Sequence, residues 1–502
     1  MNSNTQKNNE KGNNPASPRR TVWRIAWPTI IEQCLNLTVG LNEVFLIGHL
    51  SAQAGAKLGY DSALALAASS LGNFFTWIVL SCFNGIGIAT TALVARSFGA
   101  RQPEQAGTYA RQALILALLF GIGMAALMWF TAPYLLYLLG AEGQLNQLGT
   151  LFVHTTAFGM PLFAMLVTGN ACLRGSGDTR TPLIVMMVVN AVNIAVAWIF
   201  VNGQFGIPAL GVQGAALGGV TAWTCGALLV MARLIFGLKI GPTVRGFRVR
   251  PTYRLDRKIA KEILGLGLPT MGEQWAFQLG NVLFARMLID QGVVVYAAHN
   301  AVINIDSISF LPGMGLGIAN TVLVGQSLGA GKPEEAELYA SAAYKMGLLF
   351  MGIMGLLFIA IPEVFLLALV DNHEVVAAAA PALRFAGLFE MFVGTSFILT
   401  GALRGAGDTR YPLYMRMVSS ILVRVATAFL FIEILHLGLL GGRMAMAADV
   451  VFLSIMIFLR FKNGKWKTIW NTRTLNNATA QDAKVAPVEP LPVIAYSAPD
   501  AD

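Results

Sequence analysis

Residues 182–203 read PLIVMMVVNAVNIAVAWIFVNG, a run of 22 residues without a charged side chain. A helix needs about 20 predominantly apolar residues to cross the hydrocarbon core of a bilayer. The strands of a membrane barrel would instead alternate in hydropathy over about 10 residues, which this run does not do. The run therefore predicts a transmembrane helix.

The whole chain has the composition of a polytopic membrane protein. Its 502 residues are 55% hydrophobic and only 12% charged, and their mean hydropathy is +0.62. Soluble domains carry about 25% charged residues, and disordered chains combine low hydrophobicity with high charge. Both classes are therefore excluded, and we predict an all-α membrane protein with twelve transmembrane helices. The twelve apolar stretches cover residues 24–48, 64–93, 108–131, 151–171, 182–203, 214–236, 262–289, 296–325, 340–362, 378–402, 412–435 and 439–461.

The basic residues are distributed unevenly between the two sides of these predicted helices. Both termini and every second loop together contain 30 of the 35 Lys and Arg residues. Cytoplasmic loops of membrane proteins carry such an excess. We therefore expect a multi-pass protein of the cell (inner) membrane with both termini in the cytoplasm. The net charge of +9 is then a feature of topology, and no nucleic-acid partner is expected.

The chain also repeats itself. LRGSGDTRTPL at 173–183 recurs as LRGAGDTRYPL at 403–413, and PTIIEQ at 28–33 recurs as PTMGEQ at 269–274. Six predicted helices in each half make the two repeats parallel, an arrangement typical of secondary transporters with a central substrate cavity. The predicted division is a disordered tail 1–20, an amino-terminal lobe 21–236, a basic cytoplasmic linker 237–258, a carboxyl-terminal lobe 259–465 and a disordered tail 466–502.

A third duplicated motif, RSFGARQPEQA at 96–106 and QSLGAGKPEEA at 326–336, completes a set that resembles the multidrug and toxin extrusion (MATE) family. The resemblance implies two six-helix lobes and a monomer. It also implies export of organic, often cationic or polyaromatic compounds, driven by inward flow of H⁺ or Na⁺, with no other cofactor. An enzyme is not expected, because the chain has no HExxH motif and no pair of neighbouring His residues, and its five isolated His residues indicate no metal site.

Ionisable residues inside membrane spans are costly and mark functional sites. The candidates for cation coupling are Glu43, Glu273, Asp306 and Glu390. Glu43 matches the place of a coupling Asp in the family, with one additional methylene. A carboxyl group in an apolar site can hold a proton near neutral pH and release it when solvated. The alternative is an interfacial Glu that reaches water.

The other three acids also have structural alternatives. Glu273 and its repeat equivalent Glu32 each follow a Pro by four residues. Their alternative is a shared structural role, in which each side chain satisfies backbone groups that lose their helical hydrogen bonds near the Pro. For Asp306, the alternative to a coupling role is a structural role in an internal hydrogen-bond network. Glu390 lies one turn before the position where many family members carry an acid, and it is the candidate substitute.

Polar residues in several spans predict the wall of a wet substrate cavity. Asn193 matches an Asn in the amino-terminal cation site of some relatives, although Ala197 stands where they have Asp. In contrast, Arg424 and Asp449 lie at similar depths of adjacent spans, and we expect a structural ion pair between them. The residues expected at the cavity are Asn42, Glu43, Asn190, Asn193, Gln278, His299, Asn300, Asn304 and Asp306.

Two other cargoes remain open. A dedicated exporter of a metabolite such as a flavin would share these features. A flippase for lipid-linked precursors would need a basic cavity, which the location of most basic residues outside the spans disfavours.

Overall fold

The computed structural model describes residues 17–50, 55, 57–238, 249, 254–368 and 372–469, and their regular structure is helical. The amino-terminal half contains α1 (Pro18–Gly48), α3 (Ser62–Gly99), α4 (Pro103–Leu138), α5 (Gly143–Gly175), α6 (Arg180–Asn202) and α7 (Gly211–Phe236). The carboxyl-terminal half contains α8 (Arg257–Ile289), α9 (Val293–Gly329), α10 (Pro333–Ala360), α11 (Pro362–Leu367), α12 (His373–Gly387), α13 (Glu390–Gly405), α14 (Arg410–Met417), η2 (Val418–Val423), α15 (Arg424–Ala428), η3 (Phe429–Ile434), α16 (Gly438–Lys462) and η4 (Lys465–Lys467).

The long helices confirm the prediction of an all-α membrane protein. Among the described residues, ten helices are long and apolar enough to cross a membrane, and α12 and α13 form an eleventh span bent by 54°. The helix α8 occupies the remaining predicted position and has 33 residues. It is not one of the eleven, and its middle contains the polar residues Glu273, Gln278 and Asn281.

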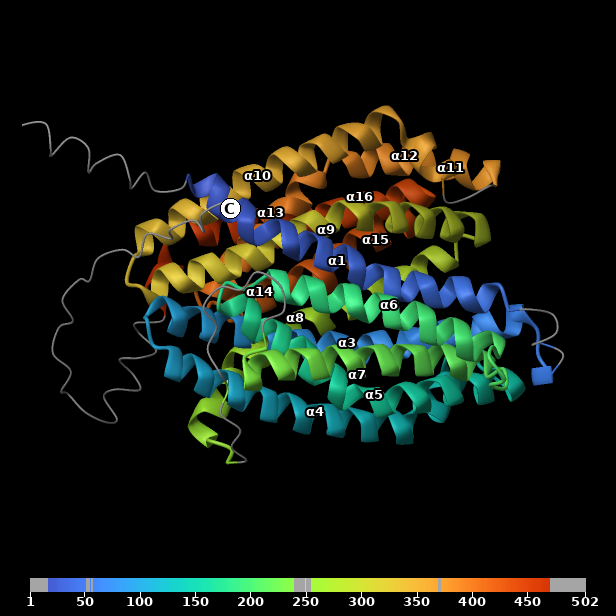
Figure 1. Ribbon diagram of the computed structural model, residues 1–502. Coiled ribbons are helices and arrows are strands. Elements are labelled where there is room, and N and C mark those ends of the chain that lie inside the picture. Colours follow the sequence, from blue (N-terminus) through green and yellow to red (C-terminus); the bar gives the residue numbers. More distant parts are fainter. Residues whose placement is uncertain are drawn as a thin grey trace, which may run out of the picture.

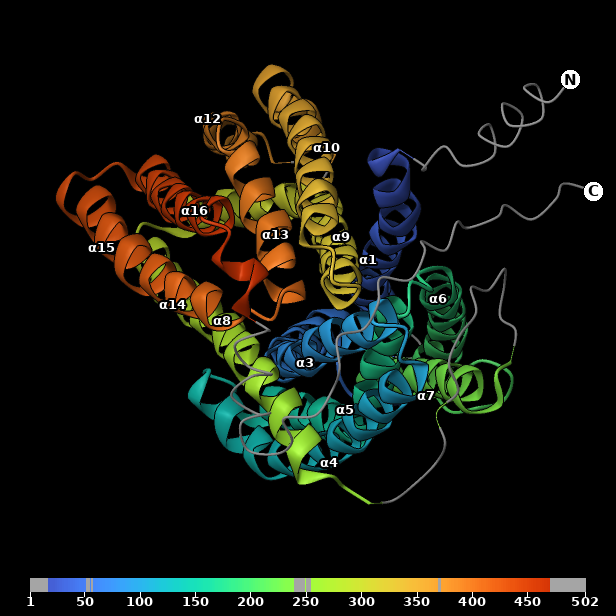
Figure 2. The ribbon, with the colours of Figure 1, turned by 90° about the vertical axis from the view of Figure 1, so that its left-hand side faces the viewer.

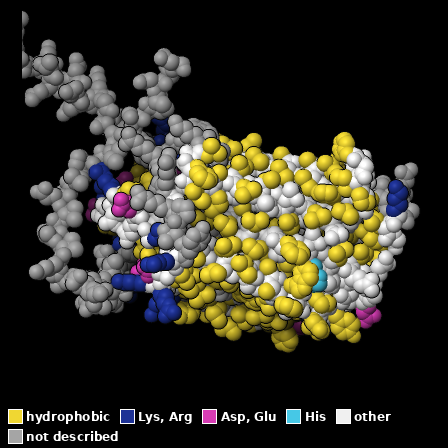
Figure 3. Space-filling model, turned by 60° about the horizontal axis from the view of Figure 1, so that its bottom comes forward, with side chains coloured by type: hydrophobic (Ala, Val, Ile, Leu, Met, Phe, Trp, Pro, Cys, Tyr) yellow, Lys and Arg dark blue, Asp and Glu magenta, His cyan; other side chains and the backbone are white. Residues whose placement is uncertain are grey.

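The surface of the bundle matches this interpretation. The helices run along one long axis, with the connections at the two ends (Figure 1). Hydrophobic side chains cover a broad band of the face seen in Figure 3, whereas most of the Lys and Arg side chains gather at one end. An apolar band between polar ends is the surface expected of a protein that spans a bilayer.

The two halves pack against each other in a symmetric way. In Figure 2, α3 to α7 form one group and α10 to α16 lie apart from them, whereas α9 packs on α3. The helix α1 packs on both α6 and α9, and α8 packs on both α14 and α3. A Cβ atom on Gly85 would lie 2.8 Å from the carbonyl oxygen of Gly267, and one on Gly315 would lie 2.9 Å from the Cα atom of Ile30. Equivalent glycines of the repeats therefore let α3 approach α8 and α9 approach α1.

The ends of the described chain differ in detail from the predicted boundaries. The expected tail 1–20 lies mostly outside the described residues, but α1 already begins at Pro18. The expected linker 237–258 also lies largely outside them, and α8 begins at Arg257 within it. The expected tail 466–502 was wrong at its start, because Trp466 is fully buried and stacks on Phe461. Residues 470–502 lie outside the described structure.

The eleventh predicted helix is not a regular α-helix. It runs continuously from Arg410 to Ile434, but η2 and η3 are π-helical and lie on either side of the short α15. π-Helical turns are rare and occur frequently at functional sites. In this helix they bracket Arg424, the first residue of α15.

Candidate functional site

The repeated motifs form the same ion pair in each half. Arg174 Nη1 lies 2.6 Å from Glu32 Oε1, and Arg404 Nη2 lies 2.8 Å from Glu273 Oε2. Each Arg belongs to an LRG motif, and each Glu follows the Pro of its first helix by four residues. All four side chains are largely buried, so each pair is shielded from water. Glu273, a candidate for coupling, therefore already has a cationic partner.

The two GDTR loops contain a second duplicated ion pair. Asp178 accepts hydrogen bonds from the backbone N–H of Thr181 at 3.0 Å and from its hydroxyl at 2.7 Å, and lies 3.7 Å from Arg233 Nη2. Asp408 Oδ2 accepts from Arg460 Nε at 2.8 Å. Arg233 and Arg460 lie near the carboxyl end of the last long helix of their halves. The loops thus join three helices in each half.

Glu43 lies beside a cavity between the two halves. Asn73 Nδ2 donates to Glu43 Oε2 at 3.4 Å, so α3 approaches α1 at this point. Asn73 also lines a cavity of about 330 Å³, and so does Gln278 of α8. The cavity is lined by Val44, Ser70, Asn73, Phe74, Trp77 and Gln278. A substrate in this cavity would contact both halves of the protein close to the Glu43 carboxylate.

The three predicted cavity asparagines of the amino-terminal half join α1 to α6. Asn42 Nδ2 donates to Asn193 Oδ1 at 2.8 Å. Asn190 donates to the Leu35 carbonyl at 3.0 Å and accepts from the hydroxyl of Thr38 at 2.5 Å. Asn190 and Asn193 are buried, and Asn42 is partly exposed. These contacts engage all three amides between α1 and α6, which leaves Glu43 as the charged group on this part of α1.

Asp306 belongs to a buried network in the carboxyl-terminal half. Arg443 Nη1 lies 2.8 Å from Asp306 Oδ2, and Arg443 Nη2 donates to the His299 carbonyl at 3.3 Å. Ser309 donates to Glu390 Oε2 at 2.9 Å and to the Asp306 carbonyl at 2.7 Å. The network therefore brings together three predicted site residues, His299, Asp306 and Glu390.

Asn300 and Asn304 do not join this network. Both side chains are exposed, whereas the neighbouring His299 and Asp306 are buried, with exposed fractions of 5% and 4%. The helix α9 thus separates its polar residues onto two faces, and the lining of a cavity by Asn300 and Asn304 stays a prediction.

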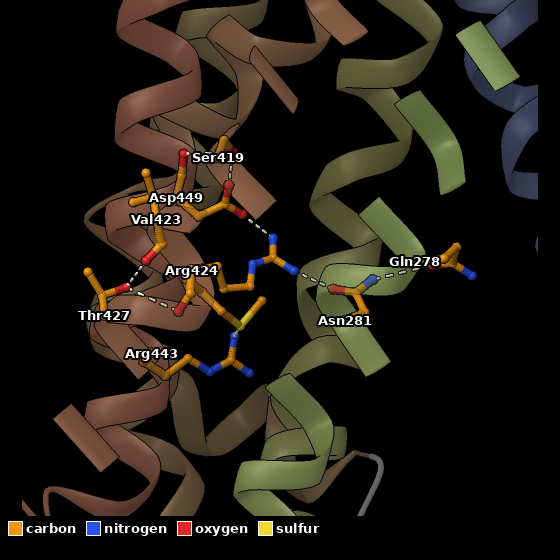
Figure 4. Close-up of polar contacts among 9 residues, drawn as sticks. Gln278, Asn281, Ser419, Val423, Arg424, Thr427, Arg443 and Asp449 are labelled. Atoms are coloured by element: carbon orange, nitrogen blue, oxygen red, sulfur yellow. Dashed lines mark hydrogen bonds and ion pairs between the residues drawn. The ribbon is translucent and has the colours of Figure 1, made fainter. Parts of the chain in front are cut away.

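A chain of polar contacts leads from Gln278 to the predicted pair of Arg424 and Asp449. Gln278 Oε1 accepts from Asn281 Nδ2 at 3.3 Å, and Asn281 Oδ1 accepts from Arg424 (Figure 4). Arg424 in turn binds Asp449, which also accepts from Ser419. Arg424 and Asp449 have side-chain exposures of only 2% and 0%. The ion pair is thus enclosed, while its polar chain reaches the cavity.

The comparison with known protein families fits this duplicated helical architecture. The sequence model of the MatE family matches residues 28–199 and 269–430, one segment in each half. The chain belongs to the MatE family. Membership in this family of transporters confirms the resemblance seen in the repeated motifs and agrees with the expectation that the protein is not an enzyme.

Relatives in this family match along almost the whole chain. A probable multidrug resistance protein NorM of Thermotoga maritima is 29% identical over 449 residues, which cover 89% of this chain and 93% of that protein. A second probable NorM, from Pseudomonas aeruginosa, is 29% identical and covers 92% of each chain.

Solved structures of the family share the fold. The outward-facing conformation of a multidrug resistance MATE transporter of the MOP superfamily superposes with a TM-score of 0.80 at 21% identity, over 90% of this chain and 97% of that one. A MATE structure in the bent conformation gives a TM-score of 0.79 at 21% identity, over 93% and 98%. The MatE fold of this chain is therefore established.

Several partners in this MatE chain were missed by sequence analysis. Arg174 and Arg404 lie between the predicted spans, where no partner was expected for them, but they neutralise buried acids. Arg443 was not expected to bind Asp306. The ion pairs of Arg174 and Arg404 could have been predicted from the sequence, because the LRG motif with the Arg and the PxxxEQ motif with the Glu are both present in each half.

Proposed function

We propose that this MatE protein is a secondary active antiporter that exports organic compounds, cationic or polyaromatic, in exchange for H⁺. Two of its relatives are named probable multidrug resistance proteins, which supports an exported cargo of this broad class. Sodium is the alternative coupling ion. The transport cycle is alternating access, in which the cavity between the halves opens to each side of the membrane in turn.

The observation that carries this proposal is the environment of Glu43. Of the four candidates for coupling, Glu273 and Asp306 are each bound to an Arg. Glu43 and Glu390 have amide or hydroxyl partners, and no ion pair links either to a base in the described structure. A carboxyl group without a cationic neighbour in an apolar site gains and loses a proton more readily than one held in an ion pair.

The position of Glu43 gives a physical route to exchange. Its carboxylate, when ionised, attracts a cationic compound in the adjacent cavity, and protonation removes that attraction. Coupling requires that proton and cargo have different affinities for the two conformations of the transporter. A single carboxyl group that binds either ligand but not both meets this requirement. Glu390, which lies near the Asp306–Arg443 pair, is the second candidate proton site and belongs to the other half.

The membrane orientation is part of the proposal. The contact of Lys467 with Glu337, 2.5 Å between Nζ and Oε2, places the end of the described chain next to the start of α10. The basic residues at this end of the molecule make it the cytoplasmic side by the positive-inside rule. We therefore place both termini in the cytoplasm of a cell (inner) membrane protein that acts as a monomer.

One observation favours a second candidate, an exporter dedicated to an anionic cargo such as a flavin or a lipid-linked precursor. Arg416, Arg424 and Arg443 lie within the spans of the carboxyl-terminal half, so the interior of this half contains basic groups. Since Arg424 and Arg443 are neutralised by Asp449 and Asp306, the excess is confined to Arg416.

Dye export from everted vesicles tests the proposal. Vesicles with the wild type, Glu43→Gln or the control Glu374→Gln receive ethidium under an imposed pH gradient or, separately, a Na⁺ gradient. Glu374 is exposed at the start of α12. We expect transport driven by the pH gradient in the wild type and control and its loss in Glu43→Gln. No export under either gradient by correctly inserted wild type would instead favour the dedicated exporter.

A further inference from the structure

Arg416 has an unusual position inside the carboxyl-terminal half. It lies on α14, six residues after the helix begins at Arg410. Its guanidinium carbon lies 5.1 Å from the centroid of the Phe277 ring of α8, and that of Arg424 lies 5.3 Å from the same centroid. Two cations therefore share one aromatic ring, and the π-helical η2 begins two residues after Arg416.

The charges around Arg416 do not cancel. The groups that act on it electrostatically are Arg404, Arg424, Glu273 and Asp449. Arg404 is bound to Glu273, and Arg424 is bound to Asp449, so both carboxylates are already engaged. No ion pair joins Arg416 to a carboxylate within the described residues. The cluster thus holds three guanidinium groups and two carboxylates, which leaves one net positive charge.

The geometry of Arg416 leaves its donors available. A guanidinium group stacked on an aromatic ring uses its face, whereas its five N–H donors lie in its plane. Arg416 and Phe277 are both partly exposed, in contrast to the enclosed Arg424. Gln278, the neighbour of Phe277 on α8, lines the cavity between the two halves. Arg416, with its open donors, therefore contacts the residue that directly precedes a cavity-lining residue of α8.

We propose that Arg416 is the binding residue for a carboxylate, or another planar anionic group, on an aromatic cargo. The guanidinium fork matches a carboxylate in a bidentate geometry, and such charge-assisted hydrogen bonds are strong. The bound anion neutralises the excess charge of the cluster. The cavity then accepts aromatic zwitterions, with the cationic part toward Glu43 and the anionic part toward Arg416, in addition to simple cations.

This inference deepens the proposed function, on which it rests for the role of the ligand as cargo. Two fluorescent dyes provide a matched test, because rhodamine 123 is the methyl ester of the carboxylic acid rhodamine 110. Binding of each dye to purified protein in nanodiscs of uncharged lipid is measured by fluorescence anisotropy, without any ion gradient. The variants are Arg416→Gln, Arg416→Lys and the control Arg286→Gln, which removes an exposed Arg.

We expect Arg416→Gln to weaken the binding of rhodamine 110 by about ten- to hundredfold, the effect of losing a charge-assisted hydrogen bond. Rhodamine 123 should bind to this variant as tightly as to the wild type, which also shows that the variant is folded. Arg416→Lys should retain part of the affinity for rhodamine 110, and Arg286→Gln all of it. An equal loss for both dyes, or no loss for either, would overturn the proposal.

The source of the anion and the proposed function are tested separately. Repeating the titration with phosphatidylglycerol in the nanodisc shows whether a lipid headgroup occupies the site. Selective displacement of rhodamine 110 by this lipid would assign Arg416 to lipid binding and overturn its role in cargo recognition. Because binding needs no gradient, a protein that binds rhodamine 110 through Arg416 but exports no dye would contradict the antiport mechanism and leave the anion site standing.

Discussion

Arg404 Nη2 lies 2.8 Å from Glu273 Oε2, and the pair joins the middle of α8, the first helix of the carboxyl-terminal half, to the end of α13. The amino-terminal half builds the same pair from Glu32 and Arg174. The duplication indicates one role in both halves. A buried ion pair holds two helices in a fixed register, and the removal of one partner leaves an uncompensated charge.

We therefore predict that Glu273→Gln destabilises the protein rather than uncoupling transport. Loss of one partner of a buried pair costs about 3 kcal/mol, and Glu32→Gln should cost about the same. The thermal unfolding midpoint of the purified protein measures the effect. Folded Glu273→Gln protein should keep its proton-driven transport. A variant with normal stability but no coupling would contradict the structural role of Glu273.

A second prediction concerns Arg424 and Asp449. Asp449→Asn should lower the free energy of unfolding by about 3–5 kcal/mol, because it leaves Arg424 enclosed without a counter-charge. The matched control is Asp290→Asn, which breaks the exposed pair with Arg286 and should cost less than about 1 kcal/mol. Unfolding in detergent followed by intrinsic fluorescence compares the two. Equal costs for both variants would show that the pair does not contribute as proposed.

The third prediction concerns the close crossing of α3 and α9 at the basic end of the molecule. A Cβ atom on Gly329 would overlap the carbonyl oxygen of Arg96, and one on Gly99 would overlap that of Gln326. Gly329→Ala must therefore separate the helices, at a cost of about 1–3 kcal/mol to the conformation in which they cross. The control Gly313→Ala lies on the same helix, with its nearest neighbour 3.8 Å away.

Labelling of a single cysteine reports this separation. Ser327 is buried beside Gly329, and Ser327→Cys is introduced into a chain whose four native cysteines are replaced. We expect a water-soluble maleimide to label this cysteine several times faster with Gly329→Ala than with Gly313→Ala. The same labelling rate in both backgrounds would mean that the crossing does not close this end.

Much of the fold followed from the sequence, because membrane spans are fixed by local composition. The charge-free run at 182–203 corresponds to α6, and the duplicated motifs predicted two similar halves. The bend between α12 and α13 and the π-helical turns around Arg424 were not predicted. No Pro lies at either feature to mark it in the sequence. At the bend, Gly387 packs closely against Gly355, a tertiary contact that the sequence alone does not reveal.

The candidate site was predicted only in part. Sequence depth placed Arg424 near Asp449, since both lie on adjacent helices at similar heights. It could not assign Arg443 to Asp306, because α9 and α16 are far apart in the chain and only the fold brings them together. Similarly, Asn300 and Asn304 are exposed whereas His299 is buried. The helical repeat shows that they lie on different faces of the helix, but it does not show which face is buried.

The release of protons on substrate binding tests the role of Glu43 most directly. Purified protein in weakly buffered solution, at a pH where its coupling carboxyl group is protonated, is mixed with ethidium, and a pH indicator measures the protons released per transporter. We predict that the wild type and Glu374→Gln each release about one proton per transporter and that Glu43→Gln releases none. Glu390→Gln should release fewer protons than the wild type only if Glu390 shares the ethidium site with Glu43. Full proton release by Glu43→Gln, or ethidium binding by the wild type that releases no proton and depends on Na⁺, would contradict proton exchange at Glu43.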